Sequence, residues 1–214
     1  MQTRERLLDA AERLFAAHGF AATSVRAITT EVPCNLAAVN YHFGGKDQLY
    51  GEVFHRRLGA LREQRLATIR LAMARAERPC LEELLRTFTA AFLEPYVSES
   101  DGRLWMRLVA RELHEPHLPA RTFLEEIVEP VHGELARALI EACPDLDLAS
   151  ARRATHSLIG QLTHFIHMDR YFTAAAEQLP GSLGWQELLD HVVTFSAAGI
   201  RGLAAAGNHR AREA

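Results

Sequence analysis

The sequence predicts an all-α protein in which a small N-terminal helix-turn-helix unit is followed by a larger helical domain. Apolar residues recur every three or four positions along most of the chain, which is the spacing of one helical face. Glycine and proline separate these periodic stretches, as they do at helix ends. No alternation of apolar and polar residues is long enough to predict a strand.

Two helices are predicted before residue 32. The first covers residues 3–18 and ends at Gly19. Thr23 or Ser24 can cap the second, because a hydroxyl oxygen can accept a free N–H of the first turn. This helix must end before Pro33, since the residue preceding a proline is pushed out of the α region. The apolar face of the first helix consists of Leu7, Leu8, Ala11, Leu14 and Phe15.

A third, very short helix follows, and a fourth begins at Lys46. Asn35 can cap the short helix through its side-chain oxygen, and Gly44 and Gly45 can end it because glycine accepts positive φ. A helix of six or seven residues cannot stand alone, because helix nucleation is costly. Packing must hold it, and we expect its remaining side chains to be displayed.

The chain is acidic overall, with a formal net charge of -3, but its charge is unevenly distributed. The first 60 residues hold seven Arg and Lys against six Asp and Glu. No acidic residue lies between Val32 and Gly45. The short third helix can therefore meet a phosphate backbone without like-charge repulsion.

The larger domain is predicted to consist of helices throughout. A proline, Pro79, can open one of them, and another, Pro130, can kink a second. The predicted helices cover residues 46–76, 79–95, 102–113, 120–142, 148–172 and 184–206. We expect a helix-turn-helix domain at 1–48, a helical effector-binding and dimerisation domain at 49–207, and a frayed tail at 208–214.

The last two predicted helices carry apolar residues around more of their circumference than one stripe. Such helices must be covered on more than one side. A homodimer with a four-helix interface explains this, with Gly160, Gly199 and Gly202 permitting close approach. The alternative is that both are central helices of a monomeric core. The expected interface residues are Leu158, Leu162, Phe165, Val192, Phe195 and Ile200.

Cysteine usage and the absence of long apolar runs favour the cytoplasm. Three cysteines, Cys34, Cys80 and Cys143, are odd in number and lack metal-ligand spacing. The N-terminus carries charges without an apolar core behind them, so no signal peptide is predicted. The longest run without Asp, Glu, Lys or Arg, 154–168, is shorter than a bilayer requires. We expect no membrane partner.

Several stretches of the N-terminal region resemble the DNA-binding domain of TetR-family transcriptional regulators. The likeness covers residues 3 to about 55, and beyond them it is one of architecture, with a weaker likeness to one subgroup over 195–200. The stretches are Leu7-Leu8-Asp9-Ala10-Ala11, Leu14-Phe15, Gly19, Thr23-Ser24-Val25-Arg26-Ala27-Ile28, Val39-Asn40-Tyr41-His42-Phe43 and Lys46-Asp47-Gln48-Leu49.

The resemblance implies a dimer that places one recognition helix per subunit in successive major grooves of operator DNA. Asn40 can bond an adenine edge, and Lys46 can hold a phosphate. Val39 and Phe43 are expected to anchor the helix in the core. Carried over by position, the DNA-binding residues are Thr23, Ser24, Arg26, Leu36, Ala37, Ala38, Asn40, Tyr41, His42 and Lys46.

The turn before the recognition helix departs from the family pattern. An Ala-Gly-Val-like turn is usual there, whereas this chain has Val32-Pro33-Cys34. Proline fixes φ and offers no N–H, so either the second helix ends a residue early or the recognition helix is tilted. An alternative hypothesis follows: an all-helical small-molecule-binding protein whose DNA reading is impaired by the Pro33 turn.

The resemblance also implies a small-molecule effector that releases a repressor from DNA. Polar and aromatic residues in the larger domain can line its pocket, since such pockets are mostly apolar with a few placed polar groups. Alternatively, the arginines form a solvated face and His164 is a core histidine. The candidates are Trp105, Arg107, Arg111, Gln161, His164 and His167.

Other chemistry is weakly indicated. The pairs His114 with His117 and His164 with His167 have helical spacing but no completing ligand, so we predict neither a metal nor a cofactor. Cys34 precedes a helix N-terminus and could act as a redox sensor, but the favoured interpretation is a small residue filling a turn. No nucleophile elbow, phosphate loop or zinc-protease motif is present in the sequence, so no enzyme is predicted.

Overall fold

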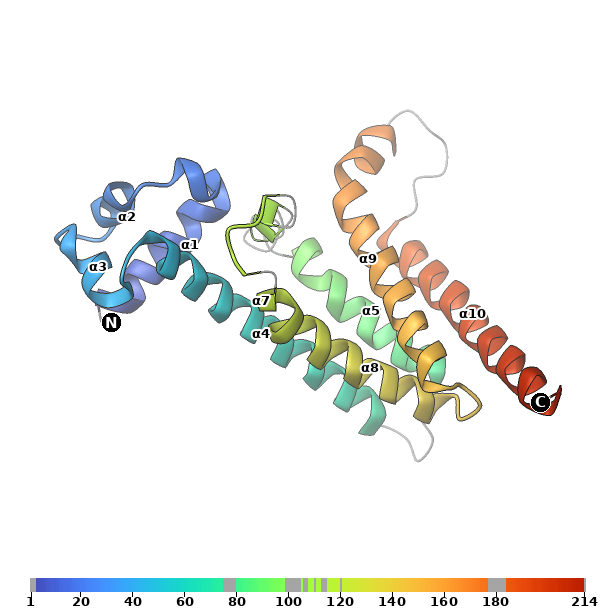
Figure 1. Cartoon of the computed structure of the whole chain (residues 1–214). Coiled ribbons are helices and arrows are strands. Elements are labelled where there is room, and N and C mark those ends of the chain that lie inside the picture. The colour runs from blue at the N-terminus through green and yellow to red at the C-terminus, as the bar shows by residue number, and fades with distance from the viewer. Residues whose placement is uncertain are drawn as a thin grey trace. The chain divides into compact units, whose positions relative to one another are not determined.

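The computed structural model describes residues 3–74, 80–98, 105, 108–109, 111–112, 115–119, 121–176 and 184–213. Every regular element within these residues is helical (Figure 1). The elements are α1 (Thr3–Ala22), α2 (Val25–Glu31), α3 (Ala37–Phe43), α4 (Lys46–Ala74), α5 (Leu81–Ser98), α7 (Arg121–Phe123), the π-helical turn η1 (Leu124–Val128), α8 (Glu129–Ala142), α9 (Leu148–Ala176) and α10 (Trp185–Glu213). The all-α prediction is therefore confirmed.

The chain forms two compact units. The first contains residues 1–61 and 98–127, and the second contains residues 62–97 and 128–214. The first unit thus includes part of the region that the sequence assigned to the larger domain.

In the first unit, α1 leaves helical geometry at Gly19, as predicted. Gly19 has φ 82° and ψ 174°, which glycine adopts without a Cβ clash. Thr23 is 2% exposed, and its hydroxyl donates to the carbonyl oxygens of Leu14 and Gly19. Ser24 caps α2 by accepting the N–H of Ala27 at 3.0 Å. The two candidate caps therefore have separate roles.

Aromatic packing and ion pairs hold α1 against the first half of α4. The Tyr50 ring lies 4.9 Å from each of the Phe15, Phe20 and Phe54 rings, measured between centroids. Arg56 pairs with Asp9 at 2.8 Å, and Arg57 pairs with Glu12. The side chains of this core include Leu7, Leu8, Phe15, Ile28, Val39, Leu49, Tyr50, Phe54 and Leu58, all at most 2% exposed.

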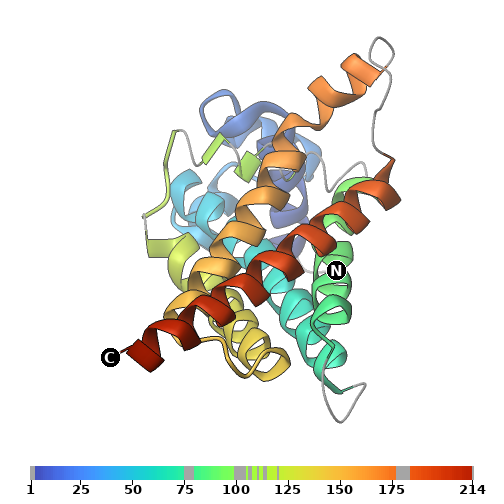
Figure 2. The same cartoon turned by 90° about the vertical axis from the view of Figure 1, so that its right-hand side faces the viewer.

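In the second unit, α9 packs against both α8 and α10 (Figures 1 and 2). The expected dimer residues divide into two groups here. Four of them are at most 3% exposed within the single chain, so they are core residues and have almost no surface to offer a partner: Leu158, Leu162, Val192 and Ile200. Phe195 is 62% exposed and Phe165 is half-buried.

Several helices extend beyond their predicted ends: α5 continues to Ser98, α9 to Ala176 and α10 to Glu213. The continuous helix expected over 120–142 contains the π-helical turn η1 just before Pro130, which lies in the first turn of α8. Pro130 can occupy that place because the N–H it lacks has no partner at a helix start. Helix α10 continues to Glu213 and so includes residues 208–213, for which the sequence predicted a frayed tail. Within the described residues, no helix has the length and apolarity to cross a membrane.

Folding stability is predicted to fall between pH 6.5 and about 4 because of His132. Burial, together with His156 and Arg65, lowers the pKa of His132 to about 4. In this pH range the unfolded chain binds a proton at His132 that the folded chain does not, so acid favours unfolding. The contribution is below about 1.4 kcal/mol per pH unit. Urea denaturation at pH 7 and pH 5 should show a smaller loss for His132→Gln than for wild type.

The matched control is His164→Gln, because His164 is exposed on α9. This variant should keep the wild-type pH dependence. Equal losses in wild type and His132→Gln would contradict the assignment.

Candidate nucleic-acid interface

The turn that precedes α3 forms without any left-handed residue. Val32 is extended, with φ -111° and ψ 110°, as its position before Pro33 requires. Asn35 accepts the Ala37 N–H through its side-chain oxygen at 3.0 Å, which confirms the predicted capping bond. Helix α2 thus ends at Glu31, and α3 begins two residues after Asn35.

The other end of α3 and its buried face are also as expected. Gly44 has φ 82° and donates its N–H to the Asn40 carbonyl oxygen at 2.9 Å. Val39 is fully buried and Phe43 is 9% exposed, so both anchor the helix. The Arg4 guanidinium lies 5.1 Å from the centroid of the Phe43 ring. Rotation of α3 about its axis is therefore fixed by packing.

The outward face of α3 carries the residues expected to read DNA. Tyr41 is 85% exposed and Leu36 is 53% exposed. Ala37 and Asn40 are exposed too, and Ala38 and His42 are half-buried. The Tyr41 and His42 rings lie 5.0 Å apart. This face therefore combines an apolar patch, an amide and two ring-bearing polar groups without an acid.

The groups expected at phosphates have different surroundings. Arg26 is exposed at the start of α2. The Lys46 ammonium lies 4.1 Å from the Phe20 ring centroid, which places the cation at the start of α4. Thr23 is the exception: its hydroxyl is buried and donates to backbone carbonyls, so the expectation that it contacts DNA was wrong. Sequence reasoning could not separate it from Ser24, since both are hydroxyl residues at one helix start.

A buried carboxylate lies in the same unit, next to the start of α4. Glu112 is 3% exposed, and it accepts the backbone N–H groups of His117 at 2.7 Å and Leu118 at 2.6 Å. It also accepts the Tyr50 hydroxyl at 3.0 Å. Burial is the main cause that raises the pKa of Tyr50, and the Glu112 charge adds to it. The His117 ring lies 4.4 Å from the Phe20 ring. Glu112 therefore ties the segment 115–119 to the N-terminal helices.

The candidate effector residues do not form one cluster within either unit. In the first unit, Trp105 is 7% exposed and packs on Phe54, whereas Arg111 is exposed and approaches Gly19. In the second unit, Gln161 bonds its own helix at Ser157 and His164 is exposed. The side chain of His167 and the whole of Arg107 lie outside the described residues.

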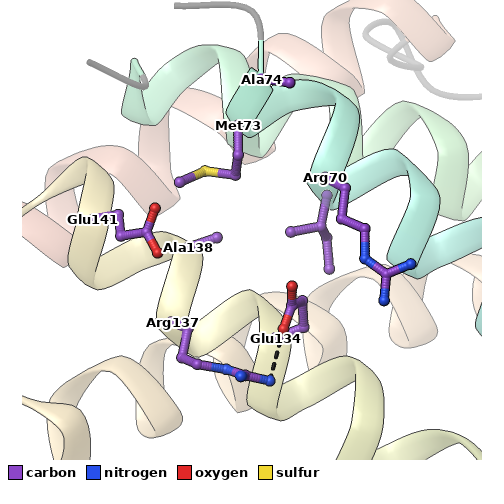
Figure 3. Close-up of a pocket in the computed structure, with 8 residues that line it drawn as sticks. Arg70, Met73, Ala74, Glu134, Arg137, Ala138 and Glu141 are labelled. Carbon is purple, nitrogen blue, oxygen red and sulfur yellow. Dashed lines mark ion pairs between the residues drawn. The ribbon is translucent and has the colours of Figure 1, made fainter. Parts of the chain in front are cut away.

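The second unit has a groove between α4 and α8. Its volume is about 370 Å³. Ile69 and Met73 give it an apolar wall, and Arg137 pairs with Glu134 at 2.6 Å across its α8 side (Figure 3). The lining residues are Ile69, Arg70, Met73, Ala74, Glu134, Arg137, Ala138 and Glu141. None of them is among the predicted effector-binding residues.

Metal chemistry finds no support in the described part of the chain. Within it, no three His, Cys, Asp or Glu residues come close enough together to hold an ion. Two histidines, His132 and His156, do form a pair, with their Nδ1 atoms 3.1 Å apart.

A short exposed helix, held by buried anchors after a tight turn, defines a helix-turn-helix protein of the DNA-binding class. Two family models match the chain. Residues 7–53 match the bacterial regulatory proteins of the tetR family, and residues 86–199 match the tetracyclin repressor-like C-terminal domain. The chain belongs to the TetR family of DNA-binding transcriptional regulators, which are not enzymes.

Individual relatives agree with this family. The chain is 28% identical over 177 residues to the HTH-type transcriptional dual regulator CecR of Shigella flexneri, covering 77% of this chain and 75% of that protein. Salmonella enterica GusR superposes with a TM-score of 0.67 at 18% identity, covering 93% and 95% of the two chains. The multidrug binding protein EbrR, crystallised with imidazole, gives 0.61 at 18%, covering 94% and 96%. The two structural likenesses concern the fold alone.

Replacing Glu112 by Gln is predicted to destabilise the protein by about 1–3 kcal/mol. An amide has one accepting oxygen where the carboxylate has two, so a buried donor from Tyr50, His117 or Leu118 is left without its partner. Urea denaturation followed by circular dichroism measures the change. Glu115→Gln is the control, since Glu115 is exposed in the same segment. Equal effects of the two substitutions would contradict the role of Glu112.

Proposed function

We propose that this chain is a homodimeric, cytoplasmic repressor that binds a palindromic operator and is released by a small-molecule effector. The observation that carries the proposal is the outward face of α3. Its polar and apolar groups are exposed while Val39 and Phe43 hold the helix from behind. A recognition helix needs this arrangement, because readers must reach base edges from a fixed backbone.

Each exposed group on α3 has a role in reading or holding DNA. Asn40 can form a bidentate bond with an adenine edge, and Leu36 with the alanines can contact thymine methyl groups. Tyr41 and His42 can hold phosphates, as can Lys46 at the start of α4. Ser24 and Arg26 add backbone contacts at the start of α2. These residues are the proposed DNA contacts, and Thr23 is not among them because its hydroxyl is buried.

The proposed dimer is supported by the uncovered side of α9 and α10. Phe195 is 62% exposed, and His191 stacks on it with 6.0 Å between ring centroids. A Cβ added at Gly160, Gly199 or Gly202 would meet nothing within 4 Å in the chain. These glycines are therefore not required by the packing of the single chain, and a second copy can approach closely there. The proposed interface therefore contains Phe195 and Phe165. It does not contain the four core residues Leu158, Leu162, Val192 and Ile200.

The proposed release requires a mechanical link between an effector and the recognition helix. In the first unit, Glu112 joins the segment 115–119 to Tyr50 on α4, four residues after Lys46. Any displacement of this segment would move the start of α4, and with it the glycine turn that ends α3. Such a shift changes how two recognition helices fit successive grooves.

Selection from random double-stranded DNA tests the proposal and the roles of two residues. The wild-type protein should enrich a palindrome with half-sites about one helical turn apart. Lys46→Ala should weaken binding to every sequence and lower the salt slope by about 1, because a phosphate contact is lost. Asn40→Ala should relax preference at one base position, at a cost of about 1–3 kcal/mol. Fluorescence anisotropy at several salt concentrations measures these effects.

The matched control is Asp47→Ala, which removes an exposed charge next to Lys46. It should leave the enriched sequence unchanged. Absence of any palindrome, together with a thermal shift by a ligand, would select the alternative of a small-molecule-binding protein with impaired DNA reading. Identical effects of the two alanine variants would contradict the separate roles.

Phe195→Lys is predicted to give a monomer at micromolar concentration. The side chain is mostly exposed in the single chain, so the folded monomer should keep its stability, whereas a charge in the interface would be buried without a partner. Analytical ultracentrifugation measures the mass. Gln186→Lys is the control, since Gln186 is exposed on the same helix about 180° away from Phe195. If wild type and Phe195→Lys have one mass, this interface is wrong.

A further inference from the structure

Arg65 on α4 is a buried cation without a protein anion. The residue as a whole is half-buried, but its Nε atom is buried and has no hydrogen-bond partner, and no ion pair joins it to a carboxylate among the described residues. The guanidinium lies 3.9 Å from the centroid of the Phe92 ring on α5. The loss of hydration lowers the pKa of Arg65 to about 9. The attraction between the cation and the aromatic ring offsets only part of this cost.

Arg56, in contrast to Arg65, is an arginine whose charge is paired within the chain. Its guanidinium bonds Asp9 at 2.8 Å and Glu12 at 2.5 Å. Charged groups that stay inside proteins are normally paired in this way. Arg65 is half-buried, as Arg56 is, but it has no such ion pair among the described residues. Its guanidinium is therefore available to bind an anionic ligand.

A second unpaired donor lies one turn from the aromatic ring that Arg65 covers. Thr89 precedes Phe92 by three positions on α5, so the two side chains share one side of that helix. Thr89 is fully buried, and its hydroxyl has no hydrogen-bond partner. A buried hydroxyl without a partner costs free energy that a bound acceptor would recover.

The surroundings of Arg65 favour an anion. The Arg65 charge contributes to the lowered pKa of His132, so the two groups lie near each other. The His132 Nδ1 atom lies 3.1 Å from the Nδ1 atom of His156. Two imidazoles this close cannot both be charged without repulsion, so their contribution is neutral or positive. Among the described residues, no carboxylate is bonded to Arg65, His132 or His156.

We propose that Arg65 binds the carboxylate of the effector, with the Phe92 ring beneath the guanidinium and the Thr89 hydroxyl as a further donor. The inference rests on the proposed function and names the chemical class of its ligand. A single unpaired cation balances one negative charge, which suits a monocarboxylate better than a phosphate dianion. Guanidinium and carboxylate also match in their planar, two-pronged geometry.

The groove on α4 and α8 gives the apolar part of such a ligand a place. Ile69 and Met73 follow Arg65 by one and two turns on the same side of α4, and both line the groove (Figure 3). Arg65 and Ile69 are about 6 Å apart along the helix axis. The volume of about 370 Å³ lies within the range of small-molecule sites. The ligand class is therefore a small monocarboxylate with an apolar tail or ring.

Thermal denaturation of the full chain with matched probes tests the site. Sodium octanoate and sodium benzoate carry the carboxylate, and octanamide and benzamide lack the charge. At saturating concentration, at least one carboxylate should raise the Tm of wild type by about 5 °C, and its amide should not. Arg65→Met should abolish this shift and raise the Tm of the unliganded protein, because an unpaired charge leaves the interior. Arg65→Lys should keep part of the shift.

Arg152→Met is the control, since Arg152 is exposed on α9 and the substitution is the same. It should retain the full carboxylate shift. Equal shifts with acid and amide, equal shifts in wild type and Arg65→Met, or a lower unliganded Tm in Arg65→Met would each overturn the site. If one of these results is found and the wild-type protein still selects a palindrome from random DNA, the carboxylate site is wrong and the proposed DNA-binding function is retained. If the protein selects no DNA sequence but shows the Arg65-dependent shift, the proposed DNA-binding function is wrong and the carboxylate site is retained.

Discussion

The N-terminal unit depends on the burial of one carboxylate, that of Glu112. A charge with 3% exposure is stable only where donors replace its lost hydration, and here they come from two distant stretches of sequence, the Tyr50 hydroxyl on α4 and the backbone of His117 and Leu118. Tyr50 in turn packs among the aromatic rings that hold α1 against α4. The position of the helix-turn-helix is thus linked to a segment more than sixty residues further along the chain.

Glu112 and Arg65 illustrate two ways in which a charge stays inside this protein. Glu112 has its donors within the chain, so its role is structural, and removing it leaves several groups without partners. Arg65 has an aromatic ring and no anion in the described structure, so part of its cost is not recovered by folding. A ligand that supplies the anion recovers that cost on binding. Instability of the empty site and affinity for the ligand then have one physical origin.

Local signals predicted the N-terminal unit well, because caps, turns and short periodicities depend on neighbouring residues. Gly19, Asn35 and Gly44 each do what their residue type suggests. Burial in the second unit depends on which helices pack together, and the sequence does not specify this. Leu158 and Leu162 were therefore predicted to lie in a dimer interface, whereas they are buried within the single chain. In both cases the sequence signal is a charged residue on an apolar stripe. Arg65 stands between Leu61 and Ile69 at intervals of four, and Glu112 follows Trp105 and Leu108 on another apolar stripe.

The unusual turn at Pro33 does not change which residues α3 exposes. Proline requires an extended residue before it, and Val32 supplies that conformation where α2 has already ended. The start of α3 then depends on the Asn35 side chain rather than on a glycine in the turn, and its end depends on Gly44. With both ends set by these bonds, the direction in which Asn40 and Tyr41 point follows from the burial of Val39 and Phe43. The turn sequence can therefore vary while the exposed face of α3 keeps its residues, because the anchors and not the turn determine that face.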